Sequence, residues 1–223
     1  TDFELPELVQ RFLELGVVGL ELFGRGGRGF GRSARRAGVG AGGGILGDGI
    51  GGGTFYAVGG AWRAFAKLPE DLRATTRLAI VGELFVPIDE LRKLARELGI
   101  ADRIRWDTRY VPNDELPEIM RRADVFAFPY RRIDASGVLM MALPYGTPIV
   151  ATEVGCFDEL LADGETAALA PPEDPQAFAL ALERVLRDPG FANAIGQRAK
   201  ALAEDQLSWS KIAVKTENTY SEI

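Results

Sequence analysis

The stretch over residues 124–152 constrains the fold of this chain more than any other, because it holds two strands and a helix in one run. Val125–Phe128 is continuously apolar, as expected of a short parallel strand buried on both faces. Pro129 ends that strand because proline has no N–H group for the next ladder bond. A helix is predicted to begin at residues 136–138, and a second buried strand is predicted over 149–151. This order is typical of a parallel sheet.

The loop between the first of these strands and the helix is placed to bind an anion. The first N–H groups of a helix have no partner inside the helix, and the helix dipole adds partial positive charge at that end. In an open parallel sheet such groups lie at the carboxyl edge, where ligands bind. Residues 136–138 are therefore candidates for contacting phosphate.

The alternation of strands and helices continues from residue 61 to the end of the chain. It predicts an α/β fold, with a Rossmann-like parallel sheet flanked by helices. One helix is predicted over 89–98, ending at Gly99, and another is capped by Asp174 with Pro175 at its first position. Further strands are predicted over 78–81, 104–106 and 168–169.

Composition excludes several classes of protein. The 223 residues are 47% hydrophobic, enough for a packed core, and no apolar run approaches the ~18 residues needed to span a bilayer. We therefore expect no membrane span and a cytoplasmic location. Cys156 is the single cysteine and histidine is absent, so the chain lacks the commonest metal ligand and general base. The net charge of −6 argues against a nucleic-acid partner.

The segment over residues 24–60 differs from the rest, because 17 of its 37 residues are glycine and five are arginine. Glycine loses the most backbone freedom on ordering, so we expect poor order there. A flexible functional loop or a reading-frame error would each explain such a composition.

The same segment offers one alternative function. Residues 24–29 match G-x-G-x-x-G, and Asp48 follows about 20 residues later, as in a dinucleotide-binding fingerprint. The third glycine should lead into a helix, but more glycine follows, and residues 38–43 show the same spacing. An NAD(P)-binding oxidoreductase domain is thus one alternative.

Several short motifs follow one another from residue 61 onward. They read Val81-Gly82-Glu83, Arg109-Tyr110-Val111-Pro112, Asp134-Ala135-Ser136-Gly137-Val138-Leu139, Gly146-Thr147-Pro148-Ile149-Val150-Ala151-Thr152, Leu161-Ala162-Asp163-Gly164-Glu165-Thr166 and Pro171-Pro172-Glu173-Asp174-Pro175. This series resembles the C-terminal, donor-binding half of the glycosyl transferases group 1 family, which are retaining enzymes of the GT-B fold. Each motif is weak alone, but the ordered series is hard to obtain by chance.

The resemblance implies a nucleotide-diphosphate sugar, such as a UDP-sugar, as donor. It implies hexosyl transfer to an acceptor glycan or small molecule, without a metal or another cofactor. Carried over by position, Ser136, Gly137 and Val138 bind the diphosphate through backbone N–H groups. Tyr110 and Val111 border the base, although ordinary packing at a strand end would explain them equally.

The resemblance also implies that Asp134 lies beside the donor sugar as the candidate catalytic carboxylate, although aspartate also caps turns and helices. The Gly-Arg pair of the family corresponds to Gly24-Arg25, so Arg25 is a candidate cation for the diphosphate. Arg131 has the right chemistry to neutralise phosphate, and as a loop residue it can equally be a solvated surface group.

Two departures from the family pattern open a third alternative. Ile133 and Met141 stand where the family has two glutamates eight positions apart, which suggests a catalytically dead module that binds a nucleotide or a partner chain. The resemblance also implies that the acceptor-binding N-terminal half is absent from this sequence except for its last few residues. We assign residues 1–23 to a remnant of that half, or to a linker and first strand, and residues 61–223 to the nucleotide-sugar-binding domain. We expect this partial chain to be inactive alone.

Overall fold

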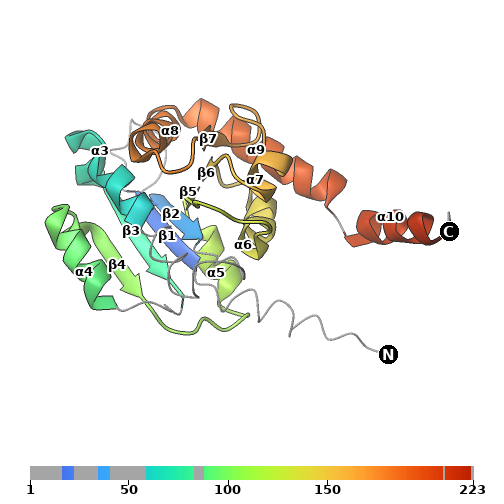
Figure 1. Ribbon diagram of the computed structural model, residues 1–223, viewed down its shortest axis with the longest axis horizontal. Coiled ribbons are helices and arrows are strands. Elements are labelled where there is room, and N and C mark those ends of the chain that lie inside the picture. Colours follow the sequence, from blue (N-terminus) through green and yellow to red (C-terminus); the bar gives the residue numbers. More distant parts are fainter. Residues whose placement is uncertain (1–16, 23–34, 41–58, 83–87, 208, 222–223) are drawn as a thin grey trace.

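The computed structural model describes residues 17–22, 35–40, 59–82, 88–207 and 209–221. Within these ranges a seven-stranded sheet has the order β4-β3-β1-β2-β5-β6-β7 (Figure 1). The strands are β1 Val17–Leu22, β2 Arg35–Gly40, β3 Thr76–Val81, β4 Ile104–Asp107, β5 Val125–Phe128, β6 Ile149–Thr152 and β7 Ala168–Ala170.

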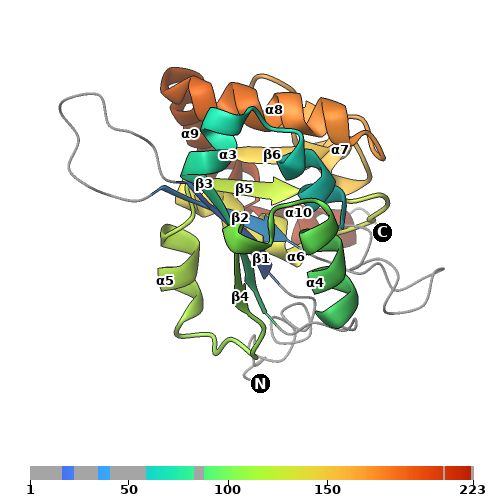
Figure 2. The same ribbon diagram turned by 90° about the vertical axis from the view of Figure 1, so that its left-hand side faces the viewer.

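The predicted parallel sheet is confirmed for most pairs of neighbouring strands. The pairs β3–β4, β2–β5, β5–β6 and β6–β7 are all parallel, and Figure 2 shows β5 and β6 running side by side in one direction. The exception is β1, which is antiparallel to both β2 and β3. Apolar patterning predicts that a strand forms but carries no information on its direction, which depends on the connections at its ends.

Strand β2 lies inside the glycine-rich segment, where the sequence argues against regular structure. For residues 35–40 that expectation is at odds with the structure, since β2 pairs with β1 on one side and β5 on the other. Two neighbouring ladders satisfy the backbone of a strand whatever its side chains are, and this offsets the entropy that glycine loses. The rest of 24–58 lies outside the described residues.

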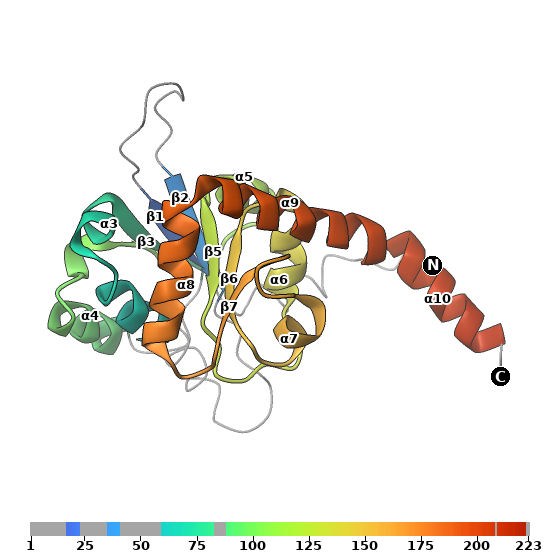
Figure 3. The ribbon, with the colours of Figure 1, turned by 90° about the horizontal axis from the view of Figure 1, so that it is seen from above.

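Helices cover both faces of the sheet. They comprise a helix over 59–66 and α3 Glu70–Thr75, α4 Ile88–Glu97, α5 Leu116–Arg121, α6 Gly137–Ala142, α7 Cys156–Leu160, α8 Pro175–Arg187, α9 Pro189–Gln206 and α10 Trp209–Ser221. Seen from above, α4 and α8 lie on one side of the strands and α6 and α7 on the other (Figure 3). The last helix, α10, extends away from the rest.

Strand β5 divides the apolar core in two. Val125 and Ala127 pack in a cluster with the helix over 59–66, α4 and α8, whereas Phe126 and Phe128 pack with α5, α6 and α7. Successive side chains of a strand point to opposite faces, so an unbroken apolar run supplies both clusters. The buried double-faced strand expected over Val125–Phe128 is confirmed.

The predicted helix ends are also confirmed. Gly99 ends α4 with a φ of +67°, in the left-handed region that glycine enters without steric cost. Asp174 caps α8, and its side chain accepts hydrogen bonds from the N–H groups of Gln176 and Ala177, each at 2.9 Å. Pro175 occupies the first position of that helix.

Candidate ligand-binding site

Helix α6 begins where the sequence predicts. Ser136 is its N-cap, in an extended conformation (φ −127°, ψ 105°), and its buried hydroxyl oxygen accepts a hydrogen bond from the Leu139 N–H at 3.1 Å. Gly137 and Val138 occupy the next two positions, where N–H groups have no partner within the helix. These two amides lie beyond the carboxyl end of β5 and are the strongest candidates for contacting an anion.

The lone cysteine lies against the same turn. Burial raises the pKa of the Cys156 thiol, and a hydrogen bond from the backbone N–H of Ser136 offsets only part of this rise. The negative charges of Glu159 and Asp134 raise the pKa further. The thiol therefore stays protonated at neutral pH and packs as a small buried group. Because the Ser136 N–H faces sulfur, Gly137 and Val138 are better placed for phosphate than Ser136.

The loop over 129–136 is held by Thr152, the last residue of β6, and by Gly155, which follows that strand. The Thr152 hydroxyl is buried and donates a hydrogen bond to the Tyr130 carbonyl oxygen at 2.6 Å. Gly155 has a φ of +49°, and a Cβ atom at that position would come within 1.6 Å of the Ile133 carbonyl oxygen. Only glycine permits this close approach, so the two loops pack backbone to backbone.

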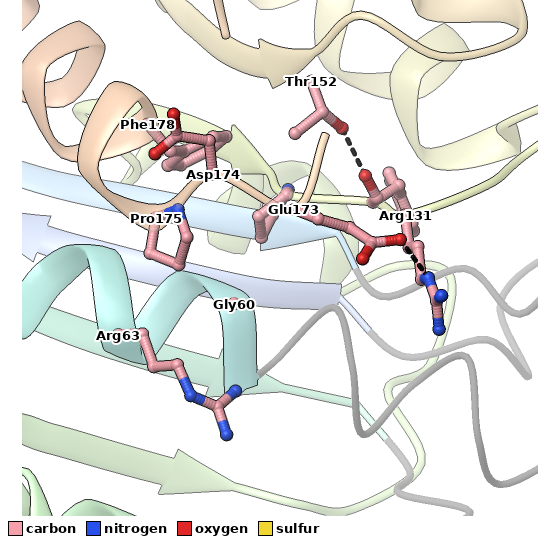
Figure 4. A pocket seen from close by; sticks show the side chains of 10 residues that line it. Gly60, Arg63, Arg131, Thr152, Glu173, Asp174, Pro175 and Phe178 are labelled. Atoms are coloured by element: carbon pink, nitrogen blue, oxygen red, sulfur yellow. Dashed lines mark hydrogen bonds and ion pairs between the residues drawn. The ribbon is translucent and has the colours of Figure 1, made fainter. Parts of the chain in front are cut away.

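A pocket with a volume of about 210 Å³ opens at the carboxyl edge of the sheet. Its wall is formed by the loops after β5 and β7 and the last residue of β6, together with the helix over 59–66 and the start of α8 (Figure 4). The charged and polar members of the wall are Arg63, Arg131, Thr152, Glu173 and Asp174.

An ion pair crosses the mouth of this pocket. The Arg131 guanidinium donates a hydrogen bond from Nε to Glu173 Oε1, joining the loop after β5 to the loop after β7 (Figure 4). Glu173 has a φ of +60° and is the one non-glycine residue with positive φ in the described part of the chain. A left-handed conformation costs an L-residue about 1–2 kcal/mol, and such outliers concentrate at functional sites.

The other predicted site residues are spread along the same edge. Asp134 is exposed in the loop that carries Arg131, but it does not line the pocket. Tyr110 and Val111 follow β4; the tyrosine is 44% exposed, whereas the valine packs against Ala79 and other apolar side chains. Arg25 lies outside the described residues.

Ile133 and Met141, which stand where the family has glutamates, both pack against apolar side chains. Ile133 is 6% exposed and packs in the cluster around Phe128, and Met141 packs against the same cluster. Asp134 is thus the carboxylate nearest in sequence to either position.

Beside Tyr110, a compact ion-pair group fixes the loop after β4. Arg109 donates to Asp107 Oδ1 at 3.0 Å and to Glu115 Oε1 at 3.1 Å. Its hydrogen bond to Glu115 lowers the pKa of that carboxyl, which keeps Glu115 charged near neutral pH. The guanidinium of Arg109 is therefore engaged with carboxylates of its own loop.

Arg63, Thr152 and Glu173 line the pocket but were not identified from the sequence. The rule that ligands gather at the carboxyl ends of strands would have marked Thr152, the last residue of β6, and Glu173, shortly after β7. No local signal marks Arg63, because its place in the wall depends on how its helix packs against the loop at Pro129.

Metal and membrane features are absent from the part of the chain that the structure describes. In that part, no three His, Cys, Asp or Glu side chains come together as metal ligands. None of its helices is both long and apolar enough to cross a bilayer.

Comparison with known proteins gives a consistent picture. A family model described as Glycosyl transferases group 1 matches residues 58–202. The D-inositol 3-phosphate glycosyltransferase of Streptomyces bingchenggensis is 32% identical over 161 residues, covering 70% of this chain and 35% of that protein. The GDP-mannose-dependent alpha-(1-6)-phosphatidylinositol monomannoside mannosyltransferase of Mycolicibacterium smegmatis is 35% identical over 151 residues, covering 64% of this chain and 39% of that protein.

Solved structures share the fold. WaaG, a glycosyltransferase involved in lipopolysaccharide biosynthesis, aligns with a TM-score of 0.61 at 25% identity, covering 72% of this chain and 42% of WaaG. Anabaena HepE, solved in complex with UDP, aligns with a TM-score of 0.64 at 22% identity, covering 74% of this chain and 44% of HepE. The chain spans about a third of the length of the first curated relatives.

Proposed function

Because the chain belongs to the glycosyl transferases group 1 family, whose members have the GT-B fold, we propose that it binds the nucleotide-sugar donor of a retaining hexosyltransferase. The observation that carries this proposal is the start of α6. There the N–H groups of Gly137 and Val138 lie at the carboxyl edge of a largely parallel sheet, the position at which such sheets bind phosphate.

The donor is proposed to be a UDP-sugar. HepE has been solved with UDP and with UDP-glucose, and its fold matches that of this chain. A GDP-sugar is the second candidate, because the relative from Mycolicibacterium smegmatis is named as GDP-mannose-dependent. Tyr110 and Val111 are proposed to border the base, where the exposed tyrosine ring offers a surface for stacking.

Transfer places negative charge on the leaving diphosphate as the sugar becomes oxocarbenium-like. Amides at Gly137 and Val138 stabilise that charge without reorganisation, because the helix already orients them. Arg25 and Arg131 are proposed to add positive charge, so that no metal is needed. Asp134 is proposed to lie beside the sugar, where a carboxylate stabilises positive charge at the anomeric carbon. Acceptor binding is assigned to a second domain, without which this chain is proposed to be inactive.

Calorimetric titration with uridine diphosphate, guanosine diphosphate and NAD, each without added metal, tests this function. Saturable binding of one nucleoside diphosphate supports the donor-binding proposal and names the nucleotide. Binding of NAD alone would replace it with the oxidoreductase alternative. If the folded chain binds none of the three nucleotides, the donor-binding proposal and the oxidoreductase alternative are both contradicted. The remaining alternative is then the catalytically dead module.

Gly137→Pro tests the proposed phosphate contact directly. Proline removes one N–H group but suits the first position of a helix, and the extended Ser136 before it is compatible with a following proline. Loss of a hydrogen bond to a charged group costs about 1.5–3 kcal/mol, so we expect nucleoside diphosphate affinity to fall at least about tenfold. Gly137→Ala keeps the N–H group and is the control. Equal affinities of the two variants would contradict the contact.

A further inference from the structure

Strands β5 and β6 are parallel neighbours, and the segments that follow them stay in contact. Three contacts join these segments: the Thr152 hydroxyl to the Tyr130 carbonyl oxygen, the Gly155 backbone to the Ile133 carbonyl oxygen, and the Cys156 sulfur to the Ser136 N–H group. They are spaced along the loop before α6, from near its beginning to the N-cap of the helix. The shape of this loop therefore depends on the segment after β6.

Of these contacts, the one made by Thr152 depends on a side-chain donor. The residue is 3% exposed, and its hydroxyl lies 2.6 Å from the Tyr130 carbonyl oxygen and 3.3 Å from that of Phe128 (Figure 4). A hydroxyl has one proton, which the shorter contact uses. Tyr130 is itself buried, so this hydrogen bond lies away from water, where losing a partner costs most.

Thr152 lines the pocket, but its hydroxyl is not suited to bind phosphate directly. An ionised diphosphate accepts hydrogen bonds and donates none, and the single hydroxyl proton is already donated to Tyr130. The Tyr130 carbonyl belongs to the planar peptide unit that leads into Arg131, so the hydrogen bond fixes the plane from which the Arg131 backbone continues. Any effect of this hydroxyl on an anion must therefore pass through the loop.

We propose that Thr152 is a positioning residue for nucleotide binding. It holds the loop before α6 in the conformation that presents Arg131 and the first N–H groups of the helix to the diphosphate. The inference rests on the proposed function and adds to it a residue that acts without touching the ligand. A ligand that binds one loop conformation loses affinity in proportion to the population of that conformation, so freeing the loop weakens binding.

Thr152→Val tests this inference, because valine keeps the branched shape and removes the donor. The affinities of uridine diphosphate and guanosine diphosphate are measured by calorimetry. For the nucleotide that the wild type binds, we expect the dissociation constant to rise about fivefold. Thr152→Ser keeps the hydroxyl and should stay within about twofold of the wild type. If valine prevents folding, Thr152→Ala removes the same donor without placing a methyl group beside the carbonyl oxygen.

Thr76→Val is the matched control for stability. Thr76 is 1% exposed, and its hydroxyl donates a hydrogen bond to the Leu72 carbonyl oxygen at 2.6 Å. It is the first residue of β3, at the edge of the sheet opposite the pocket. Urea unfolding should show that both valine variants are folded and less stable than the wild type. Only Thr152→Val should weaken nucleotide binding.

A double-mutant cycle with Gly137→Pro separates positioning from a general loss of structure. In the wild type, Gly137→Pro is expected to weaken nucleoside diphosphate binding at least about tenfold. In the Thr152→Val background the same change should weaken it less than about threefold, because the N–H group that it removes is no longer held toward the ligand. Losses of affinity that simply multiply would contradict the inference.

The outcomes also separate this inference from the function on which it rests. If the folded wild-type chain binds neither nucleoside diphosphate, both fail. If it binds one and Thr152→Val binds it equally well, the donor-binding function stands and the positioning role of Thr152 is wrong. The role is wrong also if Thr152→Ser weakens binding as much as Thr152→Val, since the hydroxyl would then not be the group that matters.

Discussion

At the scale of single residues, the site depends on backbone conformations that few side chains allow. Gly155 permits two loops to touch through their backbones, and Glu173 adopts a glycine-like φ that brings its carboxylate to the pocket. The sequence does not predict the contact of Gly155 with Ile133. That contact joins residues 22 positions apart and depends on the packing of the whole edge.

Gly155→Ala is therefore expected to destabilise the chain by about 3 kcal/mol, because the new Cβ would overlap the Ile133 carbonyl oxygen and force both loops apart. Gly99→Ala is the matched control. It also has positive φ, but nothing lies within 4 Å of its Cβ position, so only the left-handed cost of about 1–2 kcal/mol applies. Urea unfolding of both variants measures the difference. Equal losses in the free energy of unfolding would mean that the two loops separate without a free-energy cost.

At the scale of elements, α8 and α9 each begin at a side-chain cap. Asp174 caps α8, and Asp188 caps α9 by accepting a hydrogen bond from the Phe191 N–H at 2.9 Å. Such caps are local, since each involves residues within three positions, so the sequence predicts them well. Strand direction is not local, and the sequence does not predict that β1 is antiparallel to its neighbours β2 and β3.

Asp188→Ala is expected to lower the free energy of unfolding by about 1 kcal/mol, because the first turn of α9 loses the acceptor for one of its N–H groups. Asp188→Asn retains a side-chain oxygen at the same place and should keep most of the stability. Thermal unfolding followed by circular dichroism compares the two. If asparagine is as damaging as alanine, the negative charge of Asp188, and not its cap, stabilises α9.

At the scale of the whole molecule, ion pairs join helices that are distant in sequence. Arg187 at the end of α8 donates hydrogen bonds to both carboxylate oxygens of Asp71 in α3, at 3.0 and 3.2 Å. These bonds lower the pKa of Asp71. The pocket is likewise formed by residues that are distant in sequence, because its lining includes both Gly60 and Phe178. The sequence predicts the individual strands and helices. Contacts between residues that are distant in sequence depend on how these elements pack, so they are found only in the folded structure.

A depressed pKa makes the contribution of Asp71 depend on pH. It is present above the ordinary value of about 3.9 and is lost as the pH falls through the lower value of the folded chain. Asp71→Asn should therefore be less stable than the wild type at pH 7, and the two should converge as the pH falls below about 4. Urea midpoints from pH 2.5 to 7 test this. A difference that stays constant over this range would exclude the ion pair as its source, and added salt should reduce it.

The antiparallel strand β1 has a consequence for the integrity of the fold. Together with β2, it lies between the β3–β4 pair and the β5–β6–β7 group. Removal of these two strands would open unpaired backbone edges on β3 and β5 at once, each able to pair with an edge of another molecule. Loss of β1 and β2 is therefore expected to promote edge-to-edge association between chains.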